Sequence, residues 1–101
     1  MPDGERSAGL TLFVLYVAGD TYRSEQAIAN LRRLCEERLD GQCSIRVVDV
    51  TKDPDAAERE RILATPTLVK LQPQPTRRVT GDLIDFEQVL AALSLRPRRE
   101  H

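Results

Sequence analysis

The chain has 101 residues, which suits one small domain, and 41% of them are hydrophobic. Its 15 lysines and arginines nearly balance 16 acidic residues, so the charge does not indicate a general nucleic-acid-binding protein. Apolar runs fall short of the roughly 20 residues that a membrane span needs, and the polar start does not resemble a signal peptide.

The first half of the chain predicts a strand, a helix and a second strand. Residues 10–17, LTLFVLYV, are almost continuously apolar, which predicts a strand buried on both faces. A turn at 18–24 follows, in which Thr21 or Ser24 caps a helix over 24–39. Residues 44–50, SIRVVDV, predict the second strand.

The second half opens with a short helix and continues with two strands. Asp53 is a natural N-cap and Pro54 a natural first helical residue, but the apolar face that follows is narrow. Residues 67–71 predict a third strand. Residues 76–80 predict a short fourth strand at an edge of the sheet, where its arginines discourage pairing with another chain.

The last helix has a clear beginning. Asp85 is the expected cap, Gln88 stands where a capping box needs it, and Ile84 with Val89 could form a hydrophobic staple. Pro97 is expected to end this helix.

The order strand, helix, strand, helix, strand, strand, helix predicts an α/β fold with a mixed four-stranded sheet. The first βαβ unit should be parallel and the last two strands antiparallel. This is the thioredoxin-like arrangement. We expect one domain over 1–101, with a core at about 10–95 and flexible tails at 1–9 and 96–101.

The residues do not predict catalysis. A thioredoxin-like redox enzyme needs a reactive Cys-x-x-Cys where the first helix begins, and this chain has GDTYRS there. Cys35 lies deep in that helix and Cys43 just before the second strand. We expect free thiols in a reducing cytoplasm, with a disulfide as the open alternative. The single histidine is the terminal His101, and no residue pattern predicts a metal or cofactor site.

Basic residues on the predicted strands and after the second helix suggest a different role. They could form a docking surface for an acidic protein, or simply be solvated strand faces. The residues are Arg46, Arg61, Lys70, Arg77 and Arg78.

Four stretches over residues 12–95 resemble the KaiB family of bacterial circadian clock proteins: LYVAGDTYRS, VVDVTKDP, ILATPTLVKLQPQPTRRVTGDL and VLAALSL. The resemblance implies a non-enzymatic, cytoplasmic protein that binds the N-terminal ring of the KaiC ATPase. It also implies interplay with KaiA and with a thioredoxin-like sensor histidine kinase. The partner-binding residues carried over by position are Ser44, Arg46, Arg61, Lys70, Arg77 and Arg78. Gln26 stands where the family often has a basic residue.

The resemblance further implies two folds: a monomeric thioredoxin-like state that binds the partner, and a tetrameric state with a rewired second half. Pro66 stands where a thioredoxin-like fold has a cis-proline, and where the two folds begin to diverge. Ala92 and Ser94 replace a Gly and an Asp of well-known clock members, and Ala favours a helix over a strand. We therefore expect the thioredoxin-like state to dominate.

Two other functions stay open. One is a thioredoxin-like redox or stress protein that uses Cys35 or Cys43. The other is a detached sensory domain of a histidine kinase, although the chain contains no kinase motif.

Overall fold

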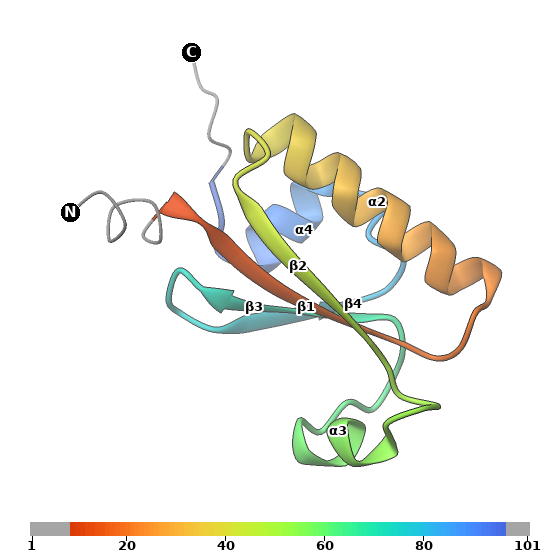
Figure 1. Cartoon of the computed structure of the whole chain (residues 1–101). Helices are drawn as coiled ribbons and strands as arrows, with labels where there is room; N and C mark the ends of the chain where they lie inside the picture. The colour runs from red at the N-terminus through yellow and green to blue at the C-terminus, as the bar shows by residue number, and fades with distance from the viewer. Residues whose placement is uncertain (1–8, 97–101) are drawn as a thin grey trace.

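The strand β1 (Thr11–Val17) lies inside the sheet and organises the fold (Figure 1). It pairs in parallel with β2 (Cys43–Asp49) and antiparallel with β3 (Thr67–Gln72). β4 (Arg77–Thr80) pairs antiparallel with β3, which gives the strand order β2-β1-β3-β4. The predicted mixed sheet of four strands is confirmed.

The computed structural model describes residues 9–96. The predicted flexible tails fall almost entirely on residues 1–8 and 97–101, which lie outside this range. The helices of the described part are α2 (Tyr22–Arg38), α3 (Pro54–Arg59) and α4 (Phe86–Ala92). Their order relative to the strands is the predicted one.

Each of these helices begins after a polar residue that satisfies a backbone amide of the first turn. The capping residues are Thr21, Asp53 and Asp85, and each side-chain oxygen lies 3.2 Å from the backbone nitrogen three residues ahead. Of the two caps considered for the first helix, Thr21 has this role, so α2 begins at residue 22 rather than at 24.

The sheet has an apolar core on each face, because successive side chains of a strand point to opposite faces. α2 and α4 cover one face, which we call the α2/α4 face. α3 covers part of the other, which we call the α3 face (Figure 1). The α2/α4 core is the larger and includes Phe13, Leu15, Leu31, Leu34, Leu68 and Leu90. The α3 core consists of Val14, Tyr16, Ala56 and Val69, with partly buried neighbours.

The last helix is shorter than predicted. It ends at Ala92, not near Pro97, because Ser94 takes a left-handed conformation with φ of 59°. The amide of Leu95 then donates to the carbonyl of Leu90 at 2.8 Å, the closing bond of a Schellman motif. At the other end, the expected staple residue Ile84 is 71% exposed, and the neighbouring Leu83 is buried instead.

The two cysteines form a disulfide, so the expectation of free thiols is wrong and the open alternative holds. Cys35 and Cys43 are only eight residues apart, and their Cα atoms lie 6.2 Å from each other. The turn between α2 and β2 brings them together through two consecutive residues with positive φ, Asp40 and Gly41. The turn therefore brings Cys35 of the helix next to Cys43 of the strand.

Candidate functional site

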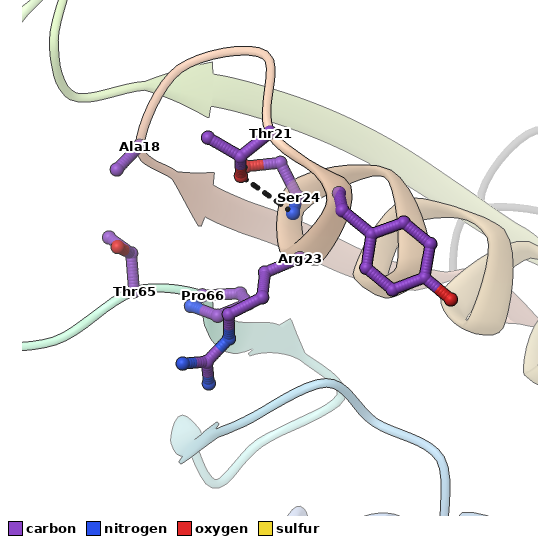
Figure 2. A pocket seen from close by; sticks show the side chains of 7 residues that line it. Ala18, Thr21, Arg23, Ser24, Thr65 and Pro66 are labelled. Carbon is purple, nitrogen blue, oxygen red and sulfur yellow. Dashed lines mark hydrogen bonds between the residues drawn. The ribbon is translucent and has the colours of Figure 1, made fainter.

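The position of a thioredoxin active site is present in this fold but holds other residues. Pro66 follows a cis peptide bond after Thr65, as a thioredoxin-like reading expects. It faces the first turn of α2 across a pocket of about 410 Å³ (Figure 2). The pocket is lined by Ala18, Thr21, Tyr22, Arg23, Ser24, Thr65 and Pro66.

This lining does not supply a nucleophile paired with a base. The hydroxyls of Thr21 and Ser24 lie 3.0 Å apart and bond to each other, and Thr21 also accepts from the Ser24 amide as the helix cap. The disulfide is remote from the pocket, because Cys35 lies in the last turn of α2 whereas the pocket lies at its first turn. The geometry therefore does not favour a thioredoxin-like redox mechanism.

Several predicted partner-binding residues gather on the α3 face. Arg46 pairs with Val14, Val14 with Val69, and Val69 with Arg78, so one row across the sheet begins and ends with an arginine. Ser44 lies two residues before Arg46 on β2 and therefore faces the same way. Ser44, Arg46 and Arg78 are all exposed.

Arg61 joins this surface through the end of α3. The guanidinium of Arg78 donates to the carbonyl of Arg61 at 3.2 Å and to the carbonyl of Glu60 at 3.0 Å. These carbonyls follow the last turn of the helix, where a cation is favourable. Ser44, Arg46, Arg61 and Arg78 therefore share one side of the molecule, and we call them the α3-face cluster.

Lys70 and Arg77 do not belong to this cluster. They are paired with each other in the β3–β4 register, and Lys70 also pairs with Phe13 of the α2/α4 core. Lys70 is 0% exposed, which differs from its expected place on a partner surface. Its burial, and secondarily the nearby Arg77, lowers the pKa of the amine. Within residues 9–96 its Nζ has no hydrogen-bond partner.

Tyr16 lies at the centre of the α3 face and was not expected to belong to a site. Burial, and then the charge of Glu60, raises the pKa of its hydroxyl, while Arg46, Arg78 and Arg59 act to lower it. The arginines of two edge strands and of α3 thus all act on one buried phenol. The sequence could place Tyr16 on the same face as Val14, two residues earlier on β1, but only the register shows that this face carries Arg46 and Arg78.

An apolar patch adjoins the cluster. A surface hollow of about 580 Å³ beside α3 is lined by Pro54, Ala57, Glu58, Arg61, Ile62 and Leu63. Leu63 is 96% exposed, and Ile62 belongs to the edge of the α3 core. Arginine next to exposed apolar side chains is a composition typical of protein–protein interfaces.

Within residues 9–96 there is no group of three or more His, Cys, Asp or Glu side chains that could hold a metal ion. The helices of this part are also too short or too polar to cross a membrane. The α3-face cluster and the apolar patch beside it together form the candidate site.

Solved structures with a similar fold include a thioredoxin and the N-terminal domain of SasA. Chloroplastic thioredoxin z matches with a TM-score of 0.62 and 26% identity, covering 84% of this chain and 82% of that one. The N-terminal domain of SasA from Synechococcus elongatus matches with a TM-score of 0.69 and 24% identity, covering 90% and 87%. These likenesses confirm the thioredoxin-like fold.

Sequence relatives are more specific. Circadian clock protein KaiB3 of Synechocystis sp. is 45% identical over 83 residues, which cover 82% of this chain and 81% of the relative. Circadian clock oscillator protein KaiB of Microcystis aeruginosa is 48% identical over 81 residues, covering 80% and 78%. The family model of the KaiB domain matches residues 14–95. The chain therefore belongs to the KaiB family.

Proposed function

We propose that this protein is a non-enzymatic timing protein that binds the N-terminal ring of the KaiC ATPase. Family membership supports this proposal, and the relatives quoted above are named as clock proteins rather than as enzymes. The α3-face cluster is the observation that supports the proposed location of the binding site. Its residues come from β2, β4 and the end of α3, yet they share one side of the molecule.

The chemistry of this side indicates the kind of surface it binds. Arg46 is exposed at one edge strand and Arg78 at the other, with a buried valine floor between them. Such an arrangement fits carboxylates on the partner, which would accelerate association and set the register. The exposed Leu63 beside Arg61 would supply apolar contact at the rim.

The test is complex formation with KaiC and ATP, followed by size-exclusion chromatography and by a binding titration. Arg46→Glu should weaken binding by about tenfold or more, because truncation or reversal of an interfacial charge commonly costs over 1 kcal/mol. Arg32→Glu on the exposed side of α2 is the matched control and should bind as the wild type does. Arg78 is a less direct probe, because it also holds the end of α3.

Each outcome has a distinct meaning. Wild-type protein that does not bind KaiC would refute the proposed function itself. Binding that Arg46→Glu leaves unchanged would refute the α3-face cluster but not the function. Lys70→Met, which alters a buried side chain, should bind KaiC normally.

We also propose that the thioredoxin-like arrangement is the dominant, monomeric and binding-competent state, and that a rewired tetramer is the minor one. Asp85 caps α4, and Ala92 is its last residue, where alanine is a better helix former than glycine. Ser94 favours neither state clearly, because it adopts the left-handed conformation that glycine prefers. Backbone chemical shifts that show residues 86–94 mainly as a strand, in a tetramer, would contradict this proposal.

The remaining partners follow from the same family membership. We propose a cytoplasmic protein that works with KaiA and a thioredoxin-like sensor histidine kinase where the organism has them. Pull-down from a lysate with wild-type and Arg46→Glu protein would check whether such partners use the same cluster.

A further inference from the structure

Cys43 directly precedes Ser44 of the α3-face cluster on β2, but it packs on the opposite side of the sheet, against the α2/α4 core. Cys35 is only 6% exposed in the last turn of α2. Cys43 is half-buried at the start of β2, which is an edge strand of the sheet. An external thiolate therefore reaches the sulfur of Cys43 more easily than that of Cys35.

The same end of α2 supports α4. Nη1 of Arg38 lies 2.9 Å from Oε2 of Glu87, which is an ion pair between the last turn of α2 and the first turn of α4. The guanidinium carbons of Arg33 and Arg38 lie 5.5 and 5.4 Å from the centre of the Phe86 ring. These distances are those of cation–π contacts. α4 is thus held by the part of α2 that carries Cys35.

The turn after α2 is closed by hydrogen bonds and by the disulfide. Asp40 and Gly41 both have positive φ, a left-handed conformation that glycine adopts freely and aspartate more readily than most other residues. The carbonyl of Cys35 accepts from the amides of Leu39 at 3.1 Å and of Gly41 at 2.9 Å. The disulfide spans this turn and links the helix covalently to β2. Its loss would leave the last turn of α2 without a covalent link to β2.

We propose that Cys35 and Cys43 form a reversible redox-modification site, and that its state sets how firmly α4 is held against α2. The co-reactant is a dithiol. One dithiol thiolate attacks Sγ of Cys43, the disulfide bond breaks, and Cys35 leaves as a thiolate that takes up a proton. The second dithiol sulfur then displaces Cys43 and closes a disulfide in the reductant. The protein gains two electrons and two protons, and the dithiol loses them.

Besides Cys35 and Cys43 the chain has no cysteine, and the second sulfur of the dithiol resolves the mixed disulfide. This inference goes beyond the proposed function and does not rest on it, because its test uses the protein alone. The site also differs from a thioredoxin active site, since it lies at the opposite end of α2 from the pocket at Pro66.

The test is amide hydrogen exchange on the full chain, air-oxidised and after equilibration with dithiothreitol. Alkylation and mass spectrometry would count the free thiols, with none expected before reduction and two after it. Reduction should speed exchange in α4 and in the last turn of α2 by about tenfold or more, because the lost cross-link favours local opening. Exchange in β1 and β3 should accelerate less.

The control is the double variant Cys35→Ser with Cys43→Ser, whose exchange should match the reduced wild type and should not respond to dithiothreitol. If this variant does not fold, the comparison of hydrogen exchange between the oxidised and the reduced wild type still tests the proposal. The proposal is overturned by free thiols in the air-oxidised protein. It is equally overturned by α4 exchange that is unchanged on reduction, or that accelerates no more than exchange in β1.

Discussion

Replacing Lys70 by methionine is expected to stabilise the protein. The lysine is 0% exposed, and within residues 9–96 its Nζ has no hydrogen-bond partner. An unsatisfied buried polar group costs ~1–3 kcal/mol, and more when it is charged. We expect a gain near the lower end of this range, about 1 kcal/mol. For a domain of this size that is a rise in Tm of about 4–8 °C.

The gain should depend on pH in a defined direction. Burial lowers the pKa of Lys70 in the folded state below its ordinary value of 10.5. Below the lowered folded pKa the amine is charged in both the folded and the unfolded state, so the whole penalty is present. As the pH rises through the lowered folded pKa towards the unfolded pKa, the folded protein sheds the charge and the penalty disappears. The advantage of Lys70→Met should therefore shrink at alkaline pH.

Urea unfolding of the wild type and the variant, from pH 6 to pH 10.5, would measure this difference. Lys52→Met is the matched control, because Lys52 is exposed and its replacement should change the free energy of unfolding little at any of these pH values. A destabilising Lys70→Met, or a gain that is equal at both ends of the pH range, would refute the reasoning that Lys70 is a buried, unsatisfied cation.

Two further variants and reduction of the disulfide test other parts of the structure. Oδ1 of Asp49 accepts bonds from the Thr51 hydroxyl, the Gly19 amide and the Thr51 amide, and these lower its pKa. Its contribution to stability is complete above the unfolded pKa of about 4 and is lost as the pH falls through the lowered folded pKa. Asp49→Asn should remove this loss of stability at acid pH, as measured by urea unfolding. A variant whose free energy of unfolding falls with acid as steeply as that of the wild type would contradict the prediction. Asp85→Ala should cost about 1 kcal/mol by thermal melting, because α4 loses its cap. Reducing the disulfide should cost about 2–3 kcal/mol in urea unfolding, given its short loop, and an unchanged midpoint would argue against the cross-link.

Local signals in the sequence identified most elements and their order. Asp53 before Pro54 and Asp85 before its helix predicted two caps correctly, because a cap depends on a side chain and an amide three residues away. The apolar run of β1 predicted its burial on both faces. The motifs were also sufficient to identify the family, which the match over residues 14–95 confirms.

Long-range contacts decided the rest. The sequence of a strand does not show which of its two faces a helix will cover. The burial of Lys70 therefore could not be distinguished from the exposure of Arg46 and Arg78 before the register was known. The disulfide required the turn at Asp40 and Gly41 to bring a helix residue to a strand residue. Likewise, α4 ends at Ala92 because Leu93 is fully buried and Ser94 turns the chain, so Leu95 also meets the core. Spacing along the chain thus determined which elements form, and only packing between distant segments determined which side chains they expose.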